Sequence, residues 1–268
     1  RNGGSTYSVS QEVGPLNFAK PGTENVEALY NGDSAVNIYV VKSREHNEGA
    51  KTPSRLADLS WRYLTDLDTF TNRSGHTQYF TPDADEGAWI RFRYRNLGID
   101  GTGELDGNTY ELGYTTVLRN QEPHKHRLST SVAYTKNEGH FEGTSGNLGL
   151  RDTAISVYDT HVYTPTELTR KADWKKGTYS YWDSYLKYHY GKEDYSVTDA
   201  ITGTGYAADY TRHSVNLSTE YGRVNKLSKD WSVVPQAQVQ VSYLGGVDTV
   251  DSQGISLSAD HSWSLVGR

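Results

Sequence analysis

Residues 231–246 read WSVVPQAQVQVSYLGG, and within them glutamine occupies every second position, at Gln236, Gln238 and Gln240. Successive side chains of a β-strand point to opposite faces, so the glutamines share one face and the intervening alanine and valines share the other. Two interpretations follow. The segment is a half-buried strand of a soluble sheet, or it is a membrane barrel strand with an apolar outside and a wet inside.

Alternating segments of the same kind recur from Gly87 onward and are separated by clusters of Gly, Asn and Asp. In residues 87–95 (GAWIRFRYR), Ile90 and Phe92 fall on one face and a row of arginines falls on the other. The other segments with this alternation are residues 108–119, 126–135, 152–163, 179–190 and 213–222, followed by a shorter one at 262–268. About eight such strands joined by turn residues predict an all-β, antiparallel protein.

The connections between these segments differ in length. The short ones are 120–125 and 224–230, and the longer ones, rich in Gly, Asp and Thr, are 96–107, 136–151 and 191–208. Short turns at one end and long loops at the other are typical of outer-membrane barrels, although a soluble up-and-down barrel is compatible with the same pattern. The connection at 164–177 is long where this scheme expects a short turn.

The composition excludes several classes of function. The 268 residues include no Cys, so the chain has no thiol nucleophile, thiolate metal site or disulfide. The net charge is −6 and no stripe of Lys and Arg is visible, so the sequence indicates no positively charged surface for nucleic acid. No apolar run approaches the roughly 20 residues of a transmembrane helix. The composition does not exclude a membrane β-barrel, because only alternate residues of about 10 per strand need be apolar.

A charged amphipathic helix is predicted ahead of the strands. Thr52 is a plausible N-cap and Pro53 suits the first helical position. The apolar residues recur at three- and four-residue steps, and the charged positions between them are Arg55, Asp58, Arg62 and Asp66. About 20 residues at roughly 1.5 Å each give a rod of about 30 Å, close to the hydrocarbon thickness of a bilayer. Because this helix is too charged to face lipid, we expect it to lie inside another structure.

The sequence divides into three parts. Residues 1–50 look like the end of an upstream β-rich domain with a boundary near 43–51, residues 51–73 form the helix, and residues 74–268 form the barrel strands. The chain begins at Arg1, so we interpret it as an internal fragment in which no signal peptide would be visible.

The row Arg91, Arg93 and Arg95 decides which face of the strands is outside. Arg on the lipid face of a barrel costs roughly 2–4 kcal/mol at the midplane, so three of them must face the lumen and Ile90 and Phe92 must face lipid. The charged residues of other strands that fall on the same side are Glu111, Asp183 and Glu220. We expect this wall to pair with the charged helix. The competing interpretation is the ordinary solvated face of a soluble sheet.

The sequence gives little support for any catalytic residue. Gly32, Asp33 and Ser34 share only a fragment of a serine-protease loop, and residues 101–107 lack the spacing of a dinucleotide fingerprint. His124 with His126, and Asp159 with His161, have spacings usable for metal binding or acid–base work, but histidine in a polar turn or strand is usually just solvated. The sequence predicts no active site, no metal, no cofactor and no small-molecule substrate.

Six ordered motifs carry a family resemblance. They are GAWIRFRYRN, YELGYTTVL, YWDSYLKY, SVNLSTEYGRV, DWSVVPQAQVQVSYLGG and SWSLVGR, and they span about residues 61–268. In this order they resemble the β-barrel translocator domain of Gram-negative autotransporters, a type V secretion module.

The resemblance implies a 12-stranded barrel of the outer membrane whose pore is threaded by the helix, most plausibly over residues 53–72. It implies that residues 1–50 are a β-rich, autochaperone-like end of an exported passenger at the cell surface, and that Gln236, Gln238 and Gln240 line the lumen. The implied partners are outer-membrane lipid, the passenger and the barrel assembly machinery. Family members finish on an aromatic residue after several more strands, so we expect roughly four strands beyond Arg268.

Three hypotheses about function follow. The first is a translocator that anchors and helps export an N-terminal passenger. The second is a soluble or surface-exposed β-sheet module that binds carbohydrate or protein through its many Tyr. The third is an outer-membrane hydrolase with residues in the long loops, and Asp159 with His161 is a candidate pair for it.

Overall fold

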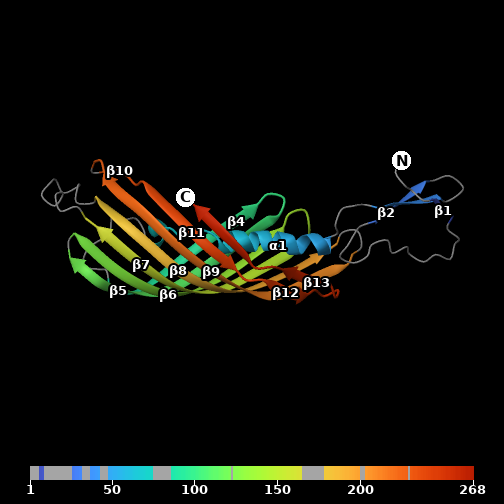
Figure 1. Ribbon diagram of the computed structural model, residues 1–268. Coiled ribbons are helices and arrows are strands. Elements are labelled where there is room, and N and C mark those ends of the chain that lie inside the picture. The colour runs from blue at the N-terminus through green and yellow to red at the C-terminus, as the bar shows by residue number, and fades with distance from the viewer. Residues whose placement is uncertain are drawn as a thin grey trace.

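The computed structural model describes residues 48–74, 86–121, 123–164, 178–199, 203–228 and 230–268, together with the backbone of strands at 6–8, 26–31 and 37–42. The three N-terminal strands β1 (Thr6–Ser8), β2 (Val26–Asn31) and β3 (Asn37–Lys42) form an antiparallel sheet in the order β1-β3-β2. Figure 1 shows this sheet beyond the end of the large sheet at which the helix begins.

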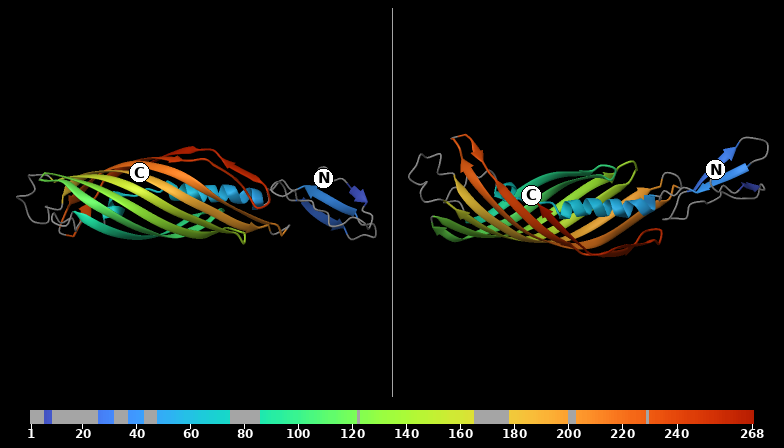
Figure 2. Two further views of the ribbon diagram at one scale, coloured as in Figure 1. Left: turned by 90° about the horizontal axis from the view of Figure 1, so that it is seen from below. Right: turned by 45° about the horizontal axis from the view of Figure 1, so that its top comes forward.

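A large antiparallel sheet makes up most of the molecule. Its strands are β4 (Gly87–Ile99), β5 (Gly103–Gln121), β6 (His124–Phe141), β7 (Asn147–Tyr163), β8 (Tyr179–Thr198), β9 (Gly205–Lys226), β11 (Gln236–Leu244) and β14 (Ser262–Gly267). They pair in chain order, with β4 and β14 at the two described edges. The sheet curves around the helix like a trough (Figures 1 and 2). The all-β antiparallel prediction is therefore confirmed, as an open sheet with the curvature of a barrel wall.

Three short strands were not expected from the sequence. β10 (Ser232–Val233) pairs with the end of β9, and β12 (Val247–Val250) pairs with β13 (Ser256–Ala259) in a hairpin between β11 and β14. The predicted turn at 224–230 is partly wrong, because β9 continues to Lys226. Residue 229 lies outside the described residues. Most of the predicted connection at 164–177 also lies outside them.

The outer face of the sheet is apolar along unbroken cross-strand lines. One such line runs through directly paired positions: Ile90, Leu112, Val132, Ile155, Tyr188, Val215, Tyr243 and Trp263. Ile90 is 66% exposed and Leu112 59%. The alternate positions point inward and are largely polar, with Glu111 and Asp183 buried. A soluble sheet buries its apolar face, so this inverted arrangement favours a wall that meets lipid.

The helical segment lies within the concave side of the sheet (Figure 2), but it is broken in two. α1 runs from Glu48 to Leu64 and α2 from Phe70 to Ser74. The predicted single rod over residues 53–72 is therefore wrong, because residues 65–69 leave the helical path. The predicted N-cap is also wrong, since Thr52 lies inside α1. Pro53 is the sixth residue of this helix, so its missing N–H removes one backbone hydrogen bond of α1.

The expected domain boundary near residues 43–51 falls partly on a helix. Its residues 48–51 are helical, and residues 43–47 lie outside the described residues. Neither described helix has the length and apolar content that a membrane-spanning helix needs.

Two apolar clusters hold the helices against the wall. Leu56, Leu59 and Tyr63 of α1 pack in one cluster with wall residues that include Leu105 and Phe141. The second cluster is formed by Phe70, Val162, Tyr179, Tyr181 and Val224. Burial of a Leu or Phe side chain stabilises by roughly 1.5–3 kcal/mol, so these clusters fix both helices on the wall. The segment between them carries the charged contacts.

Candidate functional site

Asp68 lies at the centre of the contacts between the helical segment and the wall. It sits in the break between α1 and α2, and its side chain is 3% exposed. Its carboxylate lies 3.1 Å from the Arg91 guanidinium, 3.5 Å from that of Arg93 and 3.1 Å from the Lys187 ammonium. Three cations from two strands therefore converge on one carboxylate, which makes Asp68 the anion of a shared buried site.

Glu111 joins the same network from the wall itself. It pairs with Arg91 and accepts hydrogen bonds from the Ser131 hydroxyl at 2.6 Å and from the Tyr158 hydroxyl at 2.9 Å. The four side chains Arg91, Glu111, Ser131 and Tyr158 come from four successive strands. The Arg91 side chain is thus held in place from both sides, by the wall and by Asp68.

α2 is anchored by a second group of contacts. Arg73 pairs with Asp183, which also accepts a hydrogen bond from Thr160 at 2.6 Å. The Phe70 backbone N–H donates to Glu220 at 2.9 Å. The Phe70 ring stacks on Tyr181 with their centroids 4.2 Å apart. The first turn of α2 therefore places a backbone N–H beside a buried carboxylate. The N-terminus of a helix is its favourable end for a negative charge.

Wall amides bind the backbone carbonyls released at the end of α1. Asn216 Nδ2 donates to Leu64 O at 2.7 Å, and Gln240 Nε2 donates to Thr65 O at 2.9 Å. Gln238 Nε2 lies 3.4 Å from Asp68 O. The last carbonyls of a helix have no partner within it, so these side chains satisfy groups that would otherwise be buried without hydrogen bonds. Two of the three alternating glutamines, Gln238 and Gln240, therefore meet the backbone of the helical segment.

α1 makes further polar contacts along its inward side. The Ser60 hydroxyl donates to Glu193 at 2.5 Å, and the Tyr63 hydroxyl donates to Asp152 at 3.1 Å. Asp66, just after the helix, lies 2.9 Å from Arg95. These contacts extend the polar interface along the length of the trough.

The structure brings most of the expected wall residues together on the inner face. Arg91, Arg93, Glu111, Asp183, Glu220, Gln238 and Gln240 all contact the helical segment or each other there. Gln236 is exposed at the start of β11 and accepts a hydrogen bond from Tyr181 at 3.1 Å.

Two of the expected helix residues lie elsewhere. Asp58 and Arg62 are exposed on α1, and Arg55 is half-buried. Only Asp66 of that set has a described ion pair with the arginine row. The described sheet is open and covers one side of α1, so a helix period of 3.6 residues turns the other charged positions away from it.

Sequence reasoning missed Asp68, Arg73, Lys187, Asp152 and Glu193. Lys187 and Glu193 share the inward parity of Asp183 on β8, which is a signal that the alternation already contained. Asp68 and Arg73 gave no comparable signal, because their positions depend on where the helix breaks.

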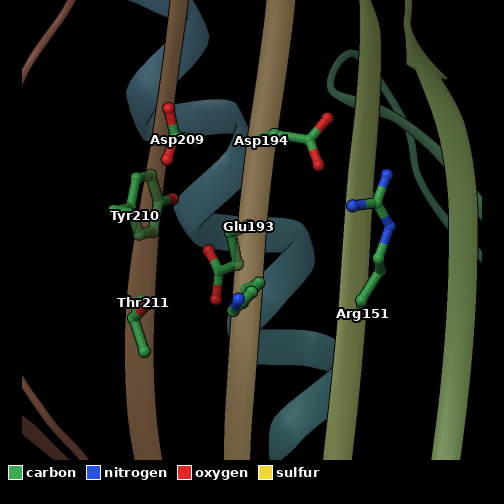
Figure 3. A pocket seen from close by; sticks show the side chains of 7 residues that line it. Arg151, Glu193, Asp194, Asp209, Tyr210 and Thr211 are labelled. Atoms are coloured by element: carbon green, nitrogen blue, oxygen red, sulfur yellow. The ribbon is translucent and has the colours of Figure 1, made fainter.

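A charged cavity of about 490 Å³ lies near α1. It is lined by Arg151, Lys192, Glu193, Asp194, Asp209, Tyr210 and Thr211 (Figure 3). Glu193 is buried on the inner side of β8, whereas its neighbour Asp194 points to the opposite face. Five of the seven lining residues lie on the outer face of the sheet, and their mixed charges define no single ligand.

The comparisons with known proteins agree with this architecture. The model of the family described as "Autotransporter beta-domain" matches residues 88–268. The chain belongs to this family. The autotransporter beta-domain is an outer-membrane β-barrel of type V secretion. The charged and amide side chains described above lie on the inner face of the described sheet.

A solved structure shows the same fold. The beta domain of the Bordetella autotransporter BrkA, determined by crystallography, aligns with 68% of this chain and 68% of its own at 21% identity and a TM-score of 0.55. No significant match was found among curated proteins. The autotransporter beta-domain assignment thus rests on the family model, and the BrkA likeness supports the fold.

Proposed function

We propose that this beta-domain anchors an N-terminal passenger in the outer membrane and helps to export it to the cell surface. The observation that carries the proposal is the convergence of Arg91, Arg93 and Lys187 on Asp68 inside a wall whose outer face is apolar. A helical segment held in this way links the wall to whatever precedes Glu48.

The inner wall would act by replacing water around the linker, which we take to be the helical segment of residues 48–74. Gln240 and Asn216 bind carbonyls at the end of α1, and Glu220 accepts from the first N–H of α2. An extended chain in transit offers such groups at every residue, so polar side chains on the wall suit a passing backbone as well as a resting helix. The proposed mechanism uses no nucleotide or redox cofactor.

The partners of the proposed function follow from the two faces. The apolar outer lines would contact outer-membrane lipid. Residues 1–50 would be the end of the passenger. Each edge of the described sheet, at β4 and β14, offers unpaired backbone groups that are unfavourable in hydrocarbon, so we expect further strands and the barrel assembly machinery to complete the wall.

Surface labelling of intact cells tests the export function. An epitope is fused ahead of Arg1 in the natural protein and expressed in a Gram-negative host. We expect antibody to label the epitope on intact cells while the beta-domain fractionates with the outer membrane. Labelling that appears only after the outer membrane is permeabilised, with the barrel correctly inserted, would contradict export.

A matched control separates assembly from export. The same fusion carrying Leu217→Arg places a charge on the apolar outer face and should fail to insert. Its epitope should therefore remain hidden. Equal labelling of this control would show that the assay does not report passage through the barrel.

A further inference from the structure

Four side chains that the proposed export function does not use meet on the outer face where β6 begins and β7 ends. The cluster consists of His124, His126, Asp159 and His161. Each strand contributes two residues spaced by two, so both point to the same face. His126 lies directly opposite His161, which brings the two pairs together across the strands.

The ligand atoms of this cluster converge. His126 Nε2 lies 2.6 Å from Asp159 Oδ1, and His161 Nε2 lies 3.1 Å from Asp159 Oδ2. One ligand atom from each of these three residues lies within 4.8 Å of the others. Zn–N and Zn–O bonds of about 2.0–2.2 Å set ligand atoms roughly 3.3 Å apart around a tetrahedral ion, so small side-chain adjustments would admit one.

His124 contacts the cluster through His161 and could fix the orientation of that ring. Its Nε2 lies 2.9 Å from Nδ1 of His161, the ring nitrogen that would not bind a metal. A metal-bound histidine almost always donates its other ring N–H to an acceptor, which fixes the ring's orientation. The rings of His126 and His161 also stack, with centroids 4.0 Å apart, and this stacking restricts their rotation further.

The location gives an aqueous cation access. The cross-strand line through His126 and His161 continues to Trp182 and Tyr221, which are 50% and 48% exposed on the same outer face. Aromatic girdles of this kind mark the boundary between membrane and water in barrels. The cluster therefore lies at the rim of the wall, and its side chains are partly exposed.

We propose that His126, Asp159 and His161 form a binding site for a divalent transition-metal ion of the Zn²⁺ type, with His124 as a positioning residue. Two imidazoles and one carboxylate suit such an ion, and three protein ligands leave a fourth position for water. The bound ion would cross-link β6 and β7 at the rim. This inference is independent of passenger export.

Metal binding by the natural full-length protein tests the site. The protein is purified in detergent without a histidine tag, stripped with chelator and equilibrated with Zn²⁺ alone. We expect one saturable Zn²⁺ per chain by elemental analysis, and X-ray absorption with imidazole scattering from two histidines. His126→Gln and Asp159→Asn should each weaken binding by at least about tenfold, and His124→Gln by about 10–100-fold.

The matched control is His213→Gln, the same substitution at an exposed histidine on the outer face of β9. It should leave the affinity unchanged. The proposal is overturned if folded wild-type protein binds no more Zn²⁺ than folded His126→Gln protein, or if His213→Gln lowers the affinity equally. Circular dichroism of each variant verifies folding, and Asp159→Asn, which keeps the side-chain shape, provides the test if a histidine variant does not fold.

Discussion

Asp68 shows how one side chain can hold the helical segment against the wall. It neutralises part of the charge of Arg91, Arg93 and Lys187, all of which lie on the inner wall. Wall cations without this carboxylate would be left close to one another and poorly solvated. The strength of the contact therefore depends on the burial of the whole group rather than on any one pair.

Asp68→Asn is expected to destabilise the protein strongly. Removing one partner of a buried ion pair costs about 3–5 kcal/mol, because the remaining charges are uncompensated. The free energy of unfolding, measured by guanidinium denaturation in lipid vesicles, should fall accordingly. Asp58→Asn is the control, since Asp58 is exposed on α1 and should change stability by no more than about 0.5 kcal/mol. If both variants lose the same free energy of unfolding, Asp68 is not the central anion of the buried network.

Gly222 marks a second residue on which the interface depends. A Cβ there would lie 2.3 Å from the Tyr181 ring, whereas a Cβ at Gly191 would meet the nearest backbone at an ordinary 3.6 Å. Gly222→Ala should displace Tyr181 from Phe70 and cost about 1–3 kcal/mol, as overpacking does. Gly191→Ala should have little effect in the same unfolding assay. If the two alanine variants unfold alike, Tyr181 does not hold α2.

At the scale of elements, the helical segment is shaped by its surroundings. The sequence of α1 and α2 has enough apolar periodicity for one continuous helix, yet the chain leaves the helical path after Leu64. Side chains from β9 and β11 bind the backbone at the break. Hydrogen bonds from the wall thus compensate for those that the helix gives up.

Gln240→Leu tests whether the wall stabilises this break. The change removes the donor to Thr65 O and the acceptor for the Tyr185 hydroxyl. Each orphaned buried group costs about 1–3 kcal/mol, so the free energy of unfolding should drop by at least that amount. Gln236→Leu is the matched control, because Gln236 is exposed and Tyr181 keeps its hydrogen bond to Glu220. An unchanged stability of Gln240→Leu would show that water satisfies Thr65 O.

At the scale of the whole molecule, the two faces of one sheet differ in polarity. Directly paired apolar residues run across the outside, and buried polar residues line the inside. We therefore expect the protein to need lipid or detergent to stay in solution. A soluble binding module would have the opposite distribution.

Leu217→Arg is expected to block membrane insertion. Leu217 is 56% exposed on β9 and lies between Leu186 and Val241 in the apolar lines. Arg at the bilayer midplane costs about 2–4 kcal/mol, against about 0–1 near an interface. Leu227→Arg, at a 61% exposed leucine just beyond β9, should insert normally. Insertion is measured by floatation with lipid vesicles, and equal insertion of both variants would contradict a lipid-facing Leu217.

Much of the wall was predictable because alternation is a local property. A slip of one residue would move every side chain of a strand to the other face, so the pattern at Ile90 or Gln240 fixes which side each residue takes. The arginine row then identified the inside, since three arginines in lipid are too costly. Periodicity also predicted the helix, and the family resemblance added the expectation that this helix threads a pore.

The sequence by itself therefore determined the eight long strands of the sheet, their two faces and the polar character of the inner face. The tertiary structure alone decided the break in the helix, the central position of Asp68 and the meeting of His126 with His161. These features depend on contacts between residues far apart in the chain, such as Phe70 with Glu220 and Thr65 with Gln240. Periodicity records which face a residue occupies, whereas strand register and sheet curvature decide which residue it meets.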